Sequence, residues 1–234
     1  VNIHFPGAVI IKNKKNIGFA AACNLGAQKA HKDYLLFYNP DLLIDAGAVN
    51  NLLDVYRLKE NVGAVTGRMR FPDGAFQATC RNFPTIYNIL FSRGSALSGL
   101  LLRKNNYTLP DFENLTEVPA VAGTLLLIKK KLFLLIDRFD ERFFMYMEDT
   151  DLCLRLHRAG YKNYYVPTAG GVHWWGQGSQ TGNSVRQWYH HSSVWKYFLK
   201  HFPNGFSLIV LPVILFINLL LKIAFPGSKG KRDY

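Results

Sequence analysis

The chain has 234 residues, enough for one or two domains with a full hydrophobic core. With 49% hydrophobic and 19% charged residues, it is too apolar for an intrinsically disordered protein and too varied for a fibrous one. The formal charge of +12 is unevenly distributed, because residues 152–234 hold ten Lys or Arg and a single Asp. This basic part suits a partner with phosphates, such as anionic lipid or nucleic acid. The alternative is a basic face that is only solvated.

Alternating apolar runs and amphipathic stretches predict an α/β fold with a mostly parallel central sheet. The expected strands are residues 8–11, 34–38, 62–65, 121–128 and 161–166, and the expected helices are residues 19–30, 49–56 and 149–159. Pro72-Asp73-Gly74 is a turn by composition. The polar, glycine-dotted residues 92–117 suit either a loop over a site or a plain surface excursion.

Cysteine usage predicts no covalent framework. Cys23, Cys80 and Cys153 are odd in number and lack the Cys-x-x-Cys spacing of zinc sites. We therefore expect free thiols in a reducing compartment.

The C-terminal residues differ in composition from the rest of the chain. Residues 206–221 carry no charge, but a helix of roughly 24 Å is short of the ~30 Å hydrocarbon core, and Pro212 interrupts it. Upstream, Trp188, Trp195, Phe198 and Phe202 share one helical stripe beside basic residues, as in helices at a membrane interface. We expect one domain over 1–200 and a membrane-associating tail over 201–234, with a buried core helix as the alternative.

Asn39-Pro40-Asp41 directly follows the expected strand 34–38. Ligands of open α/β sheets bind at the carboxyl ends of strands, so Asp41 is well placed to hold a metal ion. The same tripeptide also fits an ordinary type I turn.

Three acidic residues begin the expected helix 149–159. A carboxylate there is stabilised by the free N–H groups of the first turn, but Glu148, Asp149 and Asp151 exceed what a cap requires. Asp151 is expected to pair with Arg155 one helical turn later. Glu148 and Asp149 then remain for a ligand, and a carboxylate can act as a general base toward a hydroxyl.

His173 lies in a glycine-rich stretch, expected to be a loop, after the strand 161–166. A lone histidine is usually structural, yet this one could reach the same sheet edge as Asp41. A hard divalent cation accepts two protein ligands and completes its octahedron with waters and diphosphate oxygens. The pair therefore predicts a site for Mg²⁺ or Mn²⁺.

These residues belong to a longer series of motifs. In chain order the series is Asn16-Ile17-Gly18, Asn24-Leu25-Gly26, Asn39-Pro40-Asp41, Pro72-Asp73-Gly74, Phe83-Pro84, Ala122-Gly123, Phe139-Asp140-Glu141, Glu148-Asp149-Thr150-Asp151, Ala159-Gly160 and His173. It resembles family 2 glycosyltransferases, and within them it looks closest to the bacterial rhamnosyltransferase-like branch. The resemblance runs in order over about residues 1–200 and implies a GT-A fold, an α/β sheet that binds a nucleoside diphosphate.

The resemblance implies roles for particular residues. Asn39 and Asp41 match the first and last places of the family's DxD-type motif, and His173 resembles its late metal-binding histidine. Asp149 matches the catalytic base of the Glu-Asp motif, in which Glu148 precedes it.

Further residues are expected to contact the nucleotide-diphosphate sugar donor, beside Asn39 and Asp41. Gly18 and Asn24 match positions that line the nucleotide pocket, and Gly123 belongs to the Ala-Gly motif. The Arg81 guanidinium could meet a phosphate through two parallel hydrogen bonds.

One feature departs from the family pattern. Family members begin with a strand that ends in an Asp-Asn-x-Ser-like motif and helps to hold the nucleotide base. This chain starts after that point, with residues 1–6 approaching what is normally the second strand. We therefore expect an N-terminally truncated catalytic domain that binds its donor poorly until that strand and helix are restored.

Residues and resemblance together predict an inverting, metal-dependent glycosyltransferase of cell-surface polysaccharide synthesis. The expected partners are a nucleotide-diphosphate sugar, with rhamnose as one candidate, a glycan or lipid-linked acceptor, and the cytoplasmic face of a bacterial membrane, without nucleic acid. Two alternatives stay open: a basic nucleic-acid-binding module, and a catalytically dead membrane-bound remnant of such an enzyme.

Overall fold

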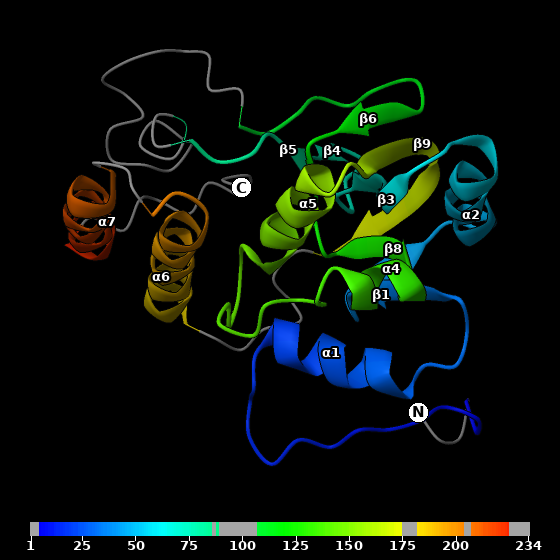
Figure 1. The fold of residues 1–234 in the computed structure, drawn as a ribbon, viewed down its shortest axis with the longest axis horizontal. Helices are drawn as coiled ribbons and strands as arrows, with labels where there is room; N and C mark the ends of the chain where they lie inside the picture. Colours follow the sequence, from blue (N-terminus) through cyan, green and yellow to red (C-terminus); the bar gives the residue numbers. More distant parts are fainter. Residues whose placement is uncertain (1–4, 86–87, 89–106, 175–181, 204–206, 225–234) are drawn as a thin grey trace.

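The computed structural model describes residues 5–85, 88, 107–174, 182–203 and 207–224. Within these ranges a mixed sheet of seven strands lies at the centre, with helices on both faces (Figure 1). The strand order is β1-β8-β3-β9-β2, with β4 beside β3 and β6 beside β9, while β5 and β7 form a separate pair. The strands are β1 (Tyr34–Tyr38), β2 (Leu42–Ile44), β3 (Val62–Arg70), β4 (Phe76–Gln77), β5 (Cys80–Arg81), β6 (Thr116–Val118), β7 (Ala120–Val121), β8 (Leu125–Lys129) and β9 (Lys162–His173).

The expectation of a mostly parallel sheet is wrong. Among the strand pairs described, only β3 and β9 are parallel. β8 runs antiparallel to both of its neighbours, β1 and β3. The strands β1, β3 and β9 therefore point the same way, as an α/β alternation predicts, but β8 separates β1 from β3 in the opposite direction.

The helices match the periodicity of the sequence. The expected helices 19–30, 49–56 and 149–159 are confirmed to within two residues at each end. The turn at 72–74 is also confirmed, with Gly74 at φ +83°. The helices are α1 (Phe19–Lys29), α2 (Ala48–Leu58), α4 (Lys130–Leu135), α5 (Glu148–Arg158), α6 (Asn183–His201) and α7 (Ser207–Ala224).

The core has two halves, one on each face of the sheet. Along β8, Leu125 and Leu127 pack with α2, whereas Leu126 and Ile128 pack with α1, α4 and α5. This alternation follows from the two-residue period of a strand, and it explains why β8 is apolar throughout.

Three expected strands differ in the structure. Residues 8–11 are not in a strand, and Val9 is 71% exposed, because no strand in the described part of the chain pairs with them. The run 121–128 divides into β7 and β8 at residues 122–124. The strand expected at 161–166 continues to His173, so the glycine-rich stretch before His173 is part of β9. Of the expected loop 92–117, residues 92–106 lie outside the described part, and residues 116–118 form β6.

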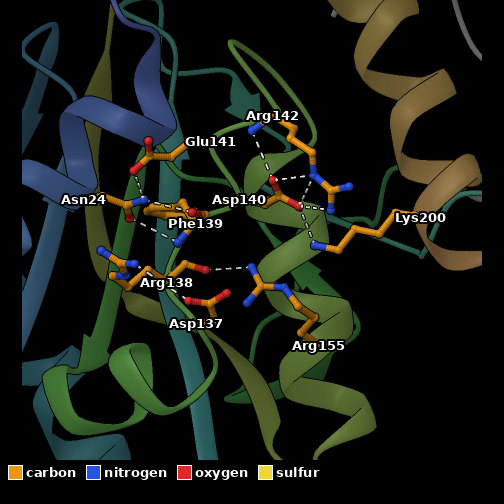
Figure 2. Close-up of a pocket in the computed structure, with 9 residues that line it drawn as sticks. All are labelled: Asn24, Asp137, Arg138, Phe139, Asp140, Glu141, Arg142, Arg155 and Lys200. Atoms are coloured by element: carbon orange, nitrogen blue, oxygen red, sulfur yellow. Dashed lines mark hydrogen bonds and ion pairs between the residues drawn. The ribbon is translucent and has the colours of Figure 1, made fainter.

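A cluster of charges joins α5 to α6. Asp151 is completely buried. Its Oδ2 accepts a hydrogen bond from Arg155 Nε at 2.9 Å, and its Oδ1 lies 2.7 Å from His201 Nε2 and 2.6 Å from Lys200 Nζ. Lys200 also bonds Asp140, in the loop before α5 (Figure 2). We call Asp140, Asp151, Arg155, Lys200 and His201 the α5–α6 charge cluster. It fixes α6 to the helix that begins with Glu148 and Asp149.

The C-terminal helices pack beside α5, on the side away from the sheet (Figure 1). The aromatic stripe of α6 is not uniformly exposed, because Phe198 is buried in a cluster with α5 and α7, while Trp188 is exposed. Pro212 lies within α7 and does not end it. In the described part of the chain, no helix is both long and apolar enough to cross a membrane. The boundary expected near residue 200 stays a prediction.

Candidate active site

The acidic N-terminus of α5 is buried. Tyr146 and Met147 have left-handed backbones, with φ of +68° and +70°, and turn the chain sharply into α5. Such conformations are costly for residues other than glycine and are concentrated at functional sites. They place Glu148 and Asp149 in the first turn, both buried.

Asp149 accepts four hydrogen bonds. Its Oδ2 accepts from Gly123 N at 3.0 Å and from Arg81 Nη2 at 3.1 Å. Its Oδ1 accepts from Thr150 N at 2.6 Å and Thr150 Oγ1 at 3.1 Å. Because a carboxylate has about four lone-pair sites, these four bonds hold Asp149 in one orientation and engage its full accepting capacity.

Arg81 is placed toward Asp149. Burial lowers the pKa of its guanidinium, but the charge of Asp149 and contacts with Tyr107 outweigh burial and raise that pKa above its usual value. Arg81 is thus a fixed cation beside the acid cluster. Its expected contact with a donor phosphate stays a prediction.

Glu148 has a different environment from its neighbour. Burial, followed by the nearby charge of Asp149, raises the pKa of Glu148 to about 8. Its Oε2 is buried without a hydrogen-bond partner in the described part of the chain. Glu148 therefore tends to keep its proton at neutral pH.

This difference predicts a pH-dependent effect of Glu148→Gln. The raised pKa means that folding favours protonated Glu148, so its contribution to stability is full below about pH 4.5 and is lost as the pH rises through about 8. Relative to the parent, Glu148→Gln should gain stability across this window, on the order of a few kcal/mol. Urea unfolding at several pH values measures this. The control is Glu60→Gln at an exposed position, and a Glu148→Gln difference that is flat with pH would contradict the prediction.

Asp41 and His173 lie next to each other, as expected. His173 Nε2 is 3.2 Å from Asp41 Oδ1, and both side chains are largely buried. The backbone explains the contact: His173 pairs with Leu42 in the β2–β9 ladder, and Trp174 N donates to Asp41 O at 2.9 Å.

Two glycines allow β9 to reach this position between its neighbours. A Cβ on Gly170 would lie 1.8 Å from Arg68 O on β3, and one on Gly171 would lie 2.2 Å from Leu43 O on β2. No other residue fits at either position without moving backbone. The Gly-Gly pair is therefore a packing requirement for bringing His173 to Asp41.

The pair suits a divalent cation. Two ligands at right angles, each about 2.1 Å from an octahedral ion, are about 3.0 Å apart, close to the observed 3.2 Å. No group of three or more His, Cys, Asp or Glu suited to a metal occurs in the described residues. A cation at Asp41 and His173 would therefore take its remaining ligands from water and diphosphate.

The two parts of the site are linked through the backbone. Asn39 N donates to Thr124 O at 3.0 Å, which ties the Asn39-Pro40-Asp41 turn to the residue after Gly123. Gly18 begins α1 with φ +86° and packs on Phe144, near the turn that leads into α5. Gly123 thus contacts Asp149 directly, whereas Asn39 and Gly18 contact Thr124 and Phe144 in the neighbouring segments. The donor contacts expected of all three stay predictions.

Asn24 lies elsewhere. Its amide bonds Phe139 and Glu141, and it lines a cavity of about 430 Å³ beside the α5–α6 charge cluster (Figure 2). Apart from Asn24, no lining residue of this cavity was expected in the site. Asn24 therefore ties α1 to the loop before α5, and its donor-binding role stays a prediction.

Sequence reasoning missed Gln77, whose Oε1 lies 2.9 Å from His173 Nδ1. Both side chains are buried. A lone glutamine after a Pro-Asp-Gly turn gives no chemical signal in the sequence. Only the pairing of Gln77 with Met69 on β3, which itself pairs with β9, brings it to His173.

Comparison with known proteins identifies the family. A family described as "Glycosyltransferase like family 2" matches residues 4–170. N-acetylglucosaminyl-diphospho-decaprenol L-rhamnosyltransferase of Mycobacterium tuberculosis (strain H37Rv) is 30% identical over 187 residues, covering 72% of this chain and 59% of that protein. Rhamnosyltransferase WbbL of Escherichia coli (strain K12) is 31% identical over 151 residues, covering 62% and 53%. The chain belongs to glycosyltransferase family 2, and it spans little more than half the length of these relatives.

Two solved structures share the fold. GalNAc-T7 with UDP, GalNAc and Mn²⁺ matches with a TM-score of 0.53 at 13% identity, covering 93% of this chain and 44% of the other. The mannosyltransferase PcManGT of Pyrobaculum calidifontis with GDP-Man and Mn²⁺ matches with a TM-score of 0.51 at 15% identity, covering 94% and 58%. The expected GT-A fold is thereby confirmed, in the form of a mixed α/β sheet.

Proposed function

We propose that this chain transfers a sugar, with inversion, from a nucleotide-diphosphate donor to a hydroxyl of a glycan or lipid-linked acceptor, with rhamnose as one candidate sugar. The observation that carries the proposal is the pairing of Asp41 with His173. The turn that holds Asp41 is bonded to Thr124, next to Gly123, which in turn donates to Asp149. Family membership and the rhamnosyltransferase relatives support it and favour an enzyme over a nucleic-acid-binding module.

Asp149 is the proposed general base. Its carboxylate takes the proton of the acceptor hydroxyl as the acceptor oxygen bonds to the anomeric carbon, and the bond to the diphosphate breaks with its electron pair leaving on the diphosphate. All lone-pair sites of Asp149 are engaged, so one donor must give way. The Thr150 hydroxyl can turn from Oδ1 without moving the backbone, and the acceptor hydroxyl would replace it.

Asp41 and His173 are the proposed ligands of Mg²⁺ or Mn²⁺. When bound, the cation would neutralise charge on the leaving diphosphate. Arg81 and Gly123 hold the base in place, and protonated Glu148 avoids a second negative charge beside it.

Removing a cation ligand tests the proposal. Asp41→Ala and His173→Ala should each weaken UDP or GDP binding about tenfold or more when Mn²⁺ is present, and leave the weak binding without Mn²⁺ unchanged. Calorimetry with and without EDTA measures both states, and His31→Ala, at an exposed position, is the control. Equal affinity of the parent with Mn²⁺ and with EDTA would overturn metal dependence, and absence of nucleotide binding would favour a dead remnant.

We further propose that α7 contacts the cytoplasmic face of a bacterial membrane. Its buried face consists of Leu211, Leu215 and Leu219, four residues apart. The opposite face leaves four large apolar side chains exposed: Val213, Phe216, Ile217 and Leu220. The net positive charge of residues 152–234 would add attraction to anionic lipid.

Replacing two residues of this exposed face tests membrane contact. Phe216→Ser with Ile217→Ser should reduce sedimentation with phosphatidylglycerol vesicles at least about tenfold, because each apolar side chain contributes roughly 1.5–3 kcal/mol when buried. Leu134→Ser with Leu135→Ser, on the exposed surface of α4, is the control. Equal sedimentation of both double variants would place the contact elsewhere.

A further inference from the structure

Gln77 makes a specific contact with the ring of His173. Its Oε1 is 2.9 Å from His173 Nδ1, while the other ring nitrogen, Nε2, is 3.2 Å from Asp41 Oδ1. Gln77 is only 5% exposed and His173 only 3%. An amide oxygen can only accept a hydrogen bond, so this contact requires the proton of the ring to be on Nδ1.

When the imidazole is neutral, Gln77 Oε1 and Asp41 Oδ1 compete for its single ring proton. A proton on Nε2 would point at the Asp41 carboxylate and leave no lone pair toward the proposed cation. A proton on Nδ1 is held by Gln77 and leaves the Nε2 lone pair on the side of Asp41. A charged acceptor usually forms the stronger bond, but Gln77 Oε1 is the nearer acceptor, at 2.9 Å against 3.2 Å for Asp41 Oδ1, so the second arrangement depends on Gln77.

Building on the proposed function, we propose that Gln77 is a positioning residue that fixes His173 as the Nδ1–H tautomer and so directs Nε2 to the divalent cation. Outer partners of metal-bound histidines generally set both tautomer and ring orientation in this way. The placement of Gln77 on β4 makes the contact rigid, since β4 is paired with β3 at Met69.

The amide nitrogen of Gln77 supports this role. Its Nε2 is buried without a hydrogen-bond partner in the described part of the chain. A buried, unpaired donor costs about 1–3 kcal/mol, which an apolar residue of similar size would avoid. For folding alone glutamine is therefore a poor choice at this position, and what it supplies is the acceptor oxygen for His173.

Three variants separate the roles of Gln77. Gln77→Leu and Gln77→Met keep the size of the side chain but remove the acceptor, whereas Gln77→Glu keeps an acceptor oxygen. Gln28→Leu makes the same change at an exposed position of α1 and is the control. Thermal melting of each variant checks folding, and Gln77→Met serves if Gln77→Leu does not fold.

The direct readout is the tautomer of His173, without any metal or nucleotide. ¹⁵N NMR of histidine-labelled protein, with His173→Ala to assign the ring, should find Nδ1 protonated in the parent, in Gln77→Glu and in the control. Gln77→Leu and Gln77→Met should move the proton to Nε2. A parent protein with the proton on Nε2, or apolar variants that keep it on Nδ1, would overturn the proposal.

The second readout is UDP affinity in the presence of Mn²⁺. Loss of an outer partner of a metal ligand typically weakens metal binding 10–100-fold, so Gln77→Leu and Gln77→Met should lose about that factor and Gln77→Glu should recover most of it. Parental affinity in both apolar variants would also overturn the proposal. If the parent itself does not bind UDP with Mn²⁺, the proposed function fails, whereas the tautomer measurement still decides the role of Gln77.

Discussion

Replacement of Asp149 by Asn is expected to reduce sugar transfer by ~10²–10⁴-fold, the usual contribution of a general base. The amide keeps the shape of the carboxylate but cannot take the proton of an acceptor hydroxyl. The neutral Asn side chain also has no charge to pair with Arg81, and its amide has one oxygen to accept hydrogen bonds where Asp149 has two. The substitution therefore removes the ion pair as well as the base.

Measuring transfer and donor binding in parallel separates these effects. Affinity for UDP with Mn²⁺ should be retained in Asp149→Asn, because Asp41 and His173 are unchanged. Asp54→Asn is a matched control, since Asp54 pairs with Arg57 on the exposed surface of α2. Transfer by Asp149→Asn within tenfold of the parent would exclude Asp149 as the base.

Asp151→Asn is expected to lower the free energy of unfolding by about 3–5 kcal/mol, the usual effect of breaking a buried ion pair from one side. Asp151 is 0% exposed and is the common partner of Arg155, Lys200 and His201. Without the charge of Asp151, the cations of the α5–α6 charge cluster would be buried without their common anionic partner. Helix α6 would also lose the ion pairs that Lys200 and His201 make with α5.

The pH dependence of this effect has a definite sign. Burial raises the pKa of Asp151, but the hydrogen bond from His201 and the charges of Arg155 and Lys200 outweigh burial, so the pKa is lowered from 3.8. Its stabilisation is therefore present above about pH 4 and is lost as the pH falls further. Urea unfolding should find the difference between parent and Asp151→Asn large at pH 7 and smaller in acid. Asp54→Asn should cost at most about 1 kcal/mol, and an equally small effect of Asp151→Asn would contradict the prediction.

The sequence predicts the parts of this fold that depend on local patterns. The helix periodicities, the turn at Gly74 and the Asp151–Arg155 pair one helical turn apart are all confirmed. The closeness of Asp41 and His173 follows from a general rule of α/β sheets, by which residues at the carboxyl ends of strands meet at one edge of the sheet.

Features that depend on distant pairing could not be predicted in this way. An apolar run such as β8 predicts a buried strand but not the direction of that strand in the sheet. Composition therefore could not predict that β8 lies antiparallel between β1 and β3. Residues 8–11 have the composition of a strand but no neighbour in the described part of the chain. Gln77 acquires its contact with His173 only through strands distant in sequence.

The parallel ladder between β3 and β9 also bears on how the protein acquires activity during folding. Val62 pairs with Lys162, so this ladder closes a loop that contains the chain from β3 to the end of α5. Contacts between such distant residues form slowly, because the entropy of the intervening loop is lost before the contact is gained. His173 reaches Asp41 only when β9 is in place, and catalytic competence should therefore arise late in folding, after the local helices and hairpins have formed.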